Sequence, residues 1–180
     1  RALLLAALLV VGPAGAAAAP VAAGDDATRL GVGPPTFTPH APVVTRHAGT
    51  FNGIRVAYTA TVAGLDVPDA QGRHGARVVA CTYAADRVGG RKADVAQRPV
   101  MFFFNGGPIV ASAYLHMGSY GPRRVEFPDD PQATPFTWAT RDNPYSLLDV
   151  ADLVFIDPAG TGFSRVAPGK DARDYWSVVA

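Results

Sequence analysis

The chain has 180 residues, 48% of them hydrophobic and 17% charged, and its 16 basic and 15 acidic side chains leave a formal charge of +1. This composition is typical of a folded globular protein and excludes an acidic tail, a basic nucleic-acid arm and a largely disordered chain. The single cysteine excludes an intramolecular disulfide framework, and the four histidines lack the close pairing of a zinc site, so we expect no structural metal.

The first 23 residues have the layout of a secretory signal peptide. Arg1 precedes an apolar run at residues 2–11, a Gly-Pro pair interrupts the run, and small residues follow at 14–23. A membrane-spanning helix needs about 20 predominantly apolar residues, and the prolines here disfavour one. We therefore expect export to the periplasm or the extracellular space, with cleavage after Ala23 and no stable membrane span.

A flexible lead-in is predicted at residues 24–45, because this stretch is rich in Gly, Pro, Thr and Asp and shows no apolar periodicity. Apolar and polar residues then alternate at 54–62 and again at 76–83, which predicts two strands with one solvated face. The turn-rich residues 64–75 between them predict a long hairpin loop.

The apolar pattern changes character at residues 100–104 and 153–156, which are continuous runs that end abruptly at polar or glycine residues. Such runs mark strands covered on both faces, as in the centre of an α/β sheet. Short helical segments are expected at 110–117 and 145–148, and residues 165–174 are polar enough to form a loop. The predicted fold class is α/β, with an outer antiparallel hairpin followed by buried central strands of a mixed sheet.

The first of these apolar runs ends in Asn105, Gly106, Gly107 and Pro108. This position puts unencumbered backbone N–H groups at the carboxyl edge of a sheet, where α/β proteins bind ligands. In hydrolases with a serine nucleophile, one donor of the oxyanion hole comes from the loop after an early strand. A glycine pair alone is more typical of a tight turn without a ligand.

Two longer stretches give the turn a context: PVMFFFNGGPIVASAYLHMGSYGPRRV at residues 99–125 and NPYSLLDVADLVFIDPAGTGFSR at 143–165. Together they resemble the amino-terminal half of secreted serine carboxypeptidases of the α/β-hydrolase fold, especially bacterial members. The resemblance covers residues 46–180, which we interpret as an incomplete domain of that fold. Since the chain does not begin with methionine and ends on apolar residues, we expect it to be a piece of a longer protein.

The resemblance implies specific roles. Gly107 would donate its N–H to the tetrahedral oxyanion, Asn105 would bind the free carboxylate at the carboxyl terminus of the substrate, and Gly106 would shape the turn. The loop 157–164 would lie beside the substrate cleft, with its glycines serving backbone geometry.

Two positions depart from the family pattern. Ile109 stands where the family usually has glycine, and a β-branched residue is costly wherever a positive φ is required. Ser119 stands where some members place a glutamate that helps to bind the substrate carboxylate, and a hydroxyl can still donate to that group.

No Gly-x-Ser-x-Gly pentapeptide occurs in these residues. Ser119 and Ser164 lie only in partial versions of it, so neither is expected to be the nucleophile. By the resemblance, the catalytic serine, aspartate and histidine lie beyond Ala180, and the fragment alone should be inactive. His116 is a candidate for lining the cleft, although a loop or surface role is the more typical one.

The leading hypothesis is a serine carboxypeptidase that acts on peptides or proteins with a free carboxyl terminus. The alternatives are an acyltransferase or esterase of the same fold, and a non-catalytic secreted binding protein, which Ile109 favours. No cofactor motif is present, so no cofactor is expected, and the charge argues against a nucleic-acid partner. The sequence does not decide the oligomeric state.

Overall fold

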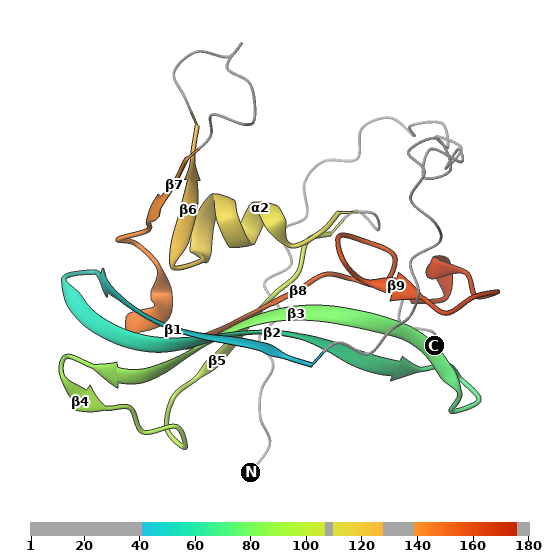
Figure 1. The fold of residues 1–180 in the computed structure, drawn as a ribbon, viewed down its shortest axis with the longest axis horizontal. Coiled ribbons are helices and arrows are strands. Elements are labelled where there is room, and N and C mark those ends of the chain that lie inside the picture. Colours follow the sequence, from blue (N-terminus) through green and yellow to red (C-terminus); the bar gives the residue numbers. More distant parts are fainter. Residues whose placement is uncertain (1–40, 107–109, 128–138, 176–180) are drawn as a thin grey trace. The chain divides into compact units, whose positions relative to one another are not determined.

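The computed structural model of the chain describes residues 41–106, 110–127 and 139–175 (Figure 1). Two compact units divide the chain, Arg1–Thr36 and Phe37–Ala180, and all the described residues belong to the second. The expected signal peptide and most of the lead-in therefore lie outside the described residues, as do Gly107 and Ile109.

Three long antiparallel strands begin the described unit: β1 (Val43–Phe51), β2 (Ile54–Pro68) and β3 (His74–Val88). Strand β1 starts inside the expected lead-in, and sequence analysis did not identify it. Asn52 and Gly53 connect β1 to β2 with φ angles of 48° and 81°. Two consecutive positive φ angles are the requirement of a tight two-residue hairpin, and the Asn-Gly pair meets it.

The predicted hairpin loop at 64–75 is wrong in extent, because pairing between β2 and β3 continues to Pro68 opposite His74. Asp66 lies opposite Arg77 in this ladder, and their carboxylate and guanidinium approach within 3.1 Å. Opposite charges facing each other stabilise a pair of strands even where the apolar alternation is lost. The loop is thereby reduced to the residues around Asp69 and Arg73.

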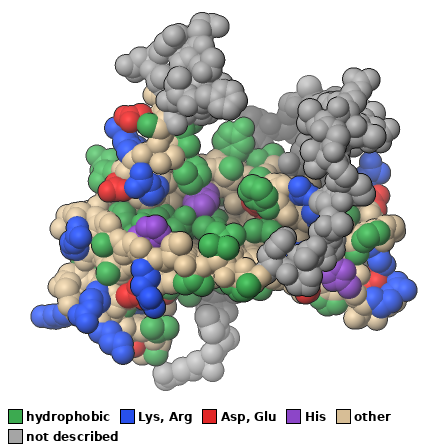
Figure 2. Space-filling view, in the orientation of Figure 1, with side chains coloured by type: hydrophobic (Ala, Val, Ile, Leu, Met, Phe, Trp, Pro, Cys, Tyr) green, Lys and Arg blue, Asp and Glu red, His purple; other side chains and the backbone are tan. Residues whose placement is uncertain are grey.

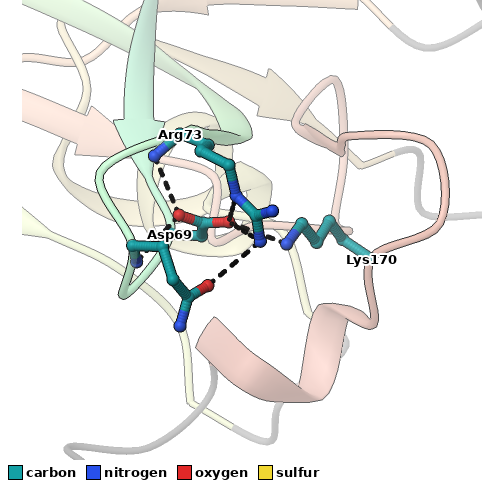
Figure 3. A network of polar contacts seen from close by, with 4 residues as sticks. Asp69, Arg73 and Lys170 are labelled. Atoms are coloured by element: carbon teal, nitrogen blue, oxygen red, sulfur yellow. Dashed lines mark hydrogen bonds and ion pairs between the residues drawn. The ribbon is translucent and has the colours of Figure 1, made fainter.

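A charged network closes this end of the hairpin (Figure 3). Asp69 accepts hydrogen bonds from the main-chain N–H groups of Gln71 and Arg73 at 2.9 and 2.8 Å, and it also pairs with the Arg73 side chain at 3.0 Å. Lys170 reaches the same carboxylate at 2.7 Å from a segment far along the chain. The bond from Lys170 and those from Arg73 and Gln71 hold the pKa of Asp69 well below its usual range.

The mixed character of the sheet is confirmed. Strand β8 (Asp152–Ile156) pairs antiparallel with β3 on one side and parallel with β5 (Val100–Phe103) on the other. The described sheet follows the order β1-β2-β3-β8-β5, and two short strands, β4 (Arg91–Lys92) and β9 (Arg165–Val166), pair with β3 off this path. Most of the pairings are antiparallel, and the described residues contain few helices.

One face of this sheet carries the core. The buried side chains that form it come from β1, β2, β3, β5, β8 and the segment before β8: Phe51, Val56, Tyr58, Ala85, Phe103, Leu148, Ala151, Leu153 and Phe155. A short α-helix, α2 (Ala113–Leu115), continues as the π-helix η1 (His116–Tyr120) and lies over this face, as does the 3-10 helix η3 (Leu147–Asp149) (Figure 1). Figure 2 shows hydrophobic side chains gathered across the middle of the view, with many basic ones nearer its ends.

Strand β5 corrects one prediction. Residues 100–104 were expected to be covered on both faces, but only Phe103 is buried, whereas the side chains of Phe102 and Phe104 are 62% and 63% exposed. Phe103 points into the core, and no described element covers the side of β5 on which Phe102 lies. Strand β8 is closer to the expected strand covered on both faces. Its Leu153 and Phe155 are buried, and Val154 and Ile156 are half-buried.

The expected helix at 110–117 begins and ends three residues later, at 113 and 120 as α2 and η1, and the expected turn at 145–148 is present as η3 at 147–149. Residues 165–174 form a loop with two short pieces, β9 and the 3-10 helix η4 (Ala172–Tyr175). A small ribbon, β6 (Arg123–Glu126) with β7 (Ala139–Asp142), makes a separate two-stranded sheet. In the described ranges, we find no helix that is both long and apolar enough to cross a membrane.

Candidate functional site

The candidate site lies where the parallel strands β5 and β8 end. Phe103 and Phe155 are in register near their carboxyl ends, so the residues that follow them emerge at the same edge of the sheet. Asn105 and Gly106 follow β5, and Asp157 follows β8. Ligands of α/β proteins bind at this kind of edge.

Asn105 has the most unusual side chain at this edge. Its residue is half-buried, and its side-chain oxygen is buried without a hydrogen-bond partner in the described part of the chain. A buried polar atom without a partner is destabilising and calls for an explanation. Gly106 beside it is exposed, with open space where a Cβ would lie. Gly107, the predicted oxyanion donor, lies outside the described residues.

Asp157 ties two segments together at the same edge. Its Oδ1 accepts hydrogen bonds from the N–H and the hydroxyl of Ser112, both at 2.8 Å, and its Oδ2 accepts one from the N–H of Phe163 at 3.2 Å. Ser112 directly precedes α2, and Phe163 lies in the loop after β8. The sequence analysis expected a cleft-side loop at 157–164 but assigned no contact to this carboxylate.

The glycines of that loop have the backbone geometry that was expected of them, with φ angles of 80° at Gly160 and 48° at Gly162. Ser164 at the end of the loop is fully buried. Its hydroxyl donates to the main-chain oxygen of Asp157 at 2.6 Å and accepts from the N–H of Val79 at 2.8 Å. A hydroxyl held in this way joins the end of the loop to Val79 on β3.

Ser119 lies in η1 and not on a strand-to-helix turn, so its surroundings differ from those of a serine nucleophile. The residue is exposed, and its hydroxyl makes no hydrogen bond within the described ranges. The π-helix ends where the N–H of Gly121 bonds to the main-chain oxygen of His116 at 2.9 Å. A Cβ at Gly121 would collide with that oxygen, which explains the glycine of the Gly-Pro pair.

The Asn-Pro-Tyr-Ser segment satisfies the last carbonyls of η1. Asn143 is only 1% exposed, and its amide donates to the carbonyls of Ser119 and Gly121 at 2.6 and 2.9 Å. The hydroxyl of Ser146 donates to the carbonyl of Tyr120 between them at 2.8 Å. The carboxyl end of a helix leaves carbonyls without partners, and side chains are one means of satisfying them. Sequence reasoning quoted this motif without assigning that role.

His116 packs on the core. Its ring stacks on Phe155 with centroids 4.4 Å apart, and its Nε2 lies 2.7 Å from the phenolic oxygen of Tyr83 on β3. Burial lowers the pKa of His116 and raises that of Tyr83 far above its ordinary value, so the pair is neutral at pH 7. His116 therefore lies at the start of η1 and not on a loop, and its half-buried ring stacks on Phe155 of β8.

Cys81 is half-buried on β3, and burial raises the pKa of its thiol. A thiol with a raised pKa is a poor nucleophile at neutral pH. Within the described ranges, no group of three or more His, Cys, Asp and Glu side chains could hold a metal ion.

Part of this chain is similar in sequence to known proteins. Residues 89–177 match the sequence model of the serine carboxypeptidase family. A stretch of 81 residues is 33% identical to the pheromone-processing carboxypeptidase KEX1 of Kluyveromyces lactis, covering 44% of this chain and 11% of that protein. The chain therefore matches only a small part of the length of this relative. These similarities support peptidase function at the level of the family, and every site residue discussed between Asn105 and Ser164 falls within the family match.

Proposed function

We propose that this chain is the carboxylate-binding and oxyanion-binding part of an exported serine carboxypeptidase. The enzyme would release the carboxyl-terminal amino acid of a peptide or protein through an acyl-enzyme intermediate. The family match and the identity to a carboxypeptidase support the reaction class. The expected signal peptide and the resemblance to secreted serine carboxypeptidases support export, to the periplasm or the extracellular space.

The observation that carries the proposal is the buried, unpartnered side-chain oxygen of Asn105 at the carboxyl end of β5. A half-turn about the last side-chain bond exchanges the amide oxygen and nitrogen, so the same position can present an N–H donor. A donor in a partly dehydrated place can bind the free carboxylate of a substrate without a paired cation. Recognition of the free carboxylate distinguishes a carboxypeptidase, which cleaves at the end of a chain, from an endopeptidase, which cleaves within it.

The other roles follow the chemistry of acyl transfer. As the nucleophile attacks the scissile carbonyl, negative charge collects on its oxygen, and a preorganised main-chain N–H stabilises that charge. We assign this donor to Gly107, with Gly106 allowing the close approach of the main chain to the substrate. The exposed hydroxyl of Ser119 is available for a further bond to the substrate carboxylate.

The nucleophile, its base and the base's acidic partner are assigned to residues outside 1–180, because no Gly-x-Ser-x-Gly sequence occurs within them. The matched stretch covers 11% of the length of the yeast relative, so a longer enzyme is in keeping with the comparison. Residues 24–180 on their own should then show no peptide hydrolysis above the blank.

The test uses the purified full-length protein, a fluorophosphonate that labels active serines, and a peptide with a free carboxyl terminus. We expect labelling at one serine and a ladder of products that lose one residue at a time from the carboxyl end, read by mass spectrometry. A folded protein that takes no label contradicts the proposal. Products that arise from internal cleavage contradict the exopeptidase assignment.

An acyltransferase or esterase of the same fold would also take the label. It would transfer the acyl group to an alcohol or cleave esters without requiring a free carboxyl terminus. A non-catalytic binding protein would take no label and would bind peptides without cleaving them. Ile109, which favoured this last alternative, lies outside the described residues.

A further inference from the structure

Two hairpin turns lie side by side at one end of the sheet. Residues 52–53 join β1 to β2, and residues 89–90 join β3 to β4. The N–H of Gly89 donates to the carbonyl of Arg55 at 2.8 Å, and a Cβ added at Gly89 would lie 4.0 Å from Cγ2 of Ile54. The second turn is as tight as the first, since φ is positive at both of its glycines. The two turns and the strand ends beside them therefore form one surface.

Four basic side chains lie on this surface, which we call the basic turn surface: Arg55 on β2, Arg87 near the end of β3, and Arg91 and Lys92 on β4. All four residues are exposed. Arg87 pairs with Lys92 in the ladder between β3 and β4, so three of the four cations belong to one short hairpin. Figure 2 shows basic side chains gathered at the end of the sheet where Figure 1 places β4.

The positive charge of the basic turn surface is not neutralised within the described residues. None of its four cations forms an ion pair there, and the Arg87 guanidinium donates only to the carbonyl of Gly90, at 3.3 Å. The acid next to Arg87, Asp86, accepts the hydroxyl of Thr59 at 2.9 Å. Several exposed arginines elsewhere do pair with a carboxylate: Arg73 with Asp69, Arg123 with Asp142 and Arg141 with Glu126. Since the whole chain has a formal charge of only +1, the excess of positive charge is local.

The chemistry of the basic turn surface narrows the kind of partner. Burial against another protein segment is costly for cations without partners, because they lose their hydration. Single-stranded nucleic acids bind through bases that stack on aromatic side chains, and the turns and strand ends of this surface expose none. Ile54 adds an aliphatic residue that is 39% exposed. Cations beside an exposed aliphatic side chain fit the interface of an anionic bilayer, which offers phosphate groups next to an apolar layer.

We propose that the basic turn surface binds the surface of an anionic phospholipid bilayer. Its four cations would lie against the phosphates of the headgroups, with Ile54 at the boundary of the apolar layer. Binding of this kind is reversible, since a few cations and one aliphatic side chain hold a protein far less firmly than a membrane-spanning helix does.

This inference goes beyond the proposed function and does not depend on it. The basic turn surface and the candidate site lie at opposite ends of the central strands. Ala80 of β3 pairs with Ile156 at the carboxyl end of β8, and β3 then runs on to Val88 beside the turn. Asn105 follows β5 at the carboxyl edge, so contact with a bilayer through the turns leaves that edge free.

The test measures cosedimentation of the full-length protein with vesicles of pure phosphatidylglycerol and of pure phosphatidylcholine. The test variant neutralises three cations of the basic turn surface: Arg55→Gln, Arg91→Gln and Lys92→Gln. The matched control removes the same charge from exposed residues elsewhere: Arg123→Gln, Arg141→Gln and Arg173→Gln. All proteins share every other segment, so any contribution of residues 1–23 cancels in the comparison. Thermal unfolding checks that each variant is folded.

We expect the wild type to bind phosphatidylglycerol vesicles and not phosphatidylcholine vesicles. Sodium chloride at about 0.5 M should weaken the binding strongly, because salt screens exposed charges. One cation near an anionic surface is worth about fivefold in affinity, so the triple variant should bind about 100-fold more weakly than the wild type. The control should stay within about threefold of the wild type, and Ile54→Ser should bind about threefold more weakly.

Equal binding by the triple variant and its control overturns the proposal, as does wild-type protein that binds neither vesicle or binds both equally. Binding to soluble polyphosphate without binding to vesicles assigns the surface to a soluble polyanion and overturns the bilayer as its partner. A wild-type protein that cleaves no peptide refutes the proposed function but leaves the vesicle result intact, because no readout here depends on activity.

Discussion

Replacing Asn143 with alanine should lower the free energy of unfolding substantially, although this buried residue is polar and is not a member of the hydrophobic core cluster. The amide of Asn143 donates to two carbonyls, and its oxygen accepts the N–H of Tyr145 at 3.3 Å. Alanine leaves the carbonyls of Ser119 and Gly121 without a donor, in a place where the native side chain is 1% exposed. Each buried polar group left without a partner costs about 1–3 kcal/mol, so for the two carbonyls we expect a loss of about 2–6 kcal/mol.

The comparison variant is Ser146→Ala, which removes one hydrogen bond to the carbonyl of Tyr120 and should cost about 1 kcal/mol. Urea unfolding followed by circular dichroism gives both values, provided that the slope with denaturant concentration stays the same. The two losses should not add in the double variant, because both side chains cap the same turn of η1. An Asn143→Ala variant within about 1 kcal/mol of the wild type refutes the idea that this side chain caps the helix.

Three further predictions concern the loops and the titrating groups. Gly162→Ala should lower the free energy of unfolding by about 1–3 kcal/mol, because φ at this position is 48° and an added Cβ would meet the Asp157 carboxylate. Gly169→Ala, with a φ of 77° and open space around the added Cβ, should lower it by about 1 kcal/mol. Thermal unfolding of the two variants measures the difference. Because the pKa of Asp69 is lowered, its ionised carboxylate stabilises the fold above pH 3.8, and this stabilisation is lost as the pH falls further. Lys170→Met removes the first cause of the shift, so it should reduce the acid-dependent loss of unfolding free energy, measured by unfolding at a series of pH values. Because burial lowers the pKa of His116, the imidazole of the unfolded chain is protonated at a higher pH than that of the folded chain, and the free energy of unfolding should fall as the pH drops below 6.5. His116→Gln should flatten this part of the plot of unfolding free energy against pH. A plot that does not change would contradict the lowered pKa of His116.

The central strands and their order of appearance could be predicted from residue patterns, because alternation and continuous apolar runs report directly on a sheet. The full length of the β2–β3 hairpin could not. Its outer part is held by the cross-strand pair of Asp66 and Arg77 and by the charges around Asp69, and neither leaves an apolar signal. Strand β1 was missed because apolar and polar residues do not alternate along it, so the segment carries no strand pattern.

Burial was harder to predict than strand identity. The run at 100–104 is apolar throughout, but Phe102 and Phe104 are exposed, since composition reports what a face could bury and not what covers it. Among the site residues, Asn105 was identified by its place after a strand and by the family resemblance. Asp157 and Asn143 were not, because Asp157 bonds to the N–H and hydroxyl of Ser112, 45 residues away, and Asn143 donates to carbonyls 24 and 22 residues away. A single sequence carries no signal of such contacts.

The most direct measurement of the central idea is the ratio of kcat/KM for a peptide with a free carboxyl terminus to that for the same peptide amidated. It should be taken on the full-length protein and on its Asn105→Ala variant, with Gln97→Ala, an exposed amide outside the site, as the control. We expect a strong preference for the free acid that Asn105→Ala reduces about tenfold or more and Gln97→Ala leaves intact, in keeping with the loss of a hydrogen bond to a charged group. Equal cleavage of the two peptides by the wild type, or a preference that survives in Asn105→Ala, would contradict the account.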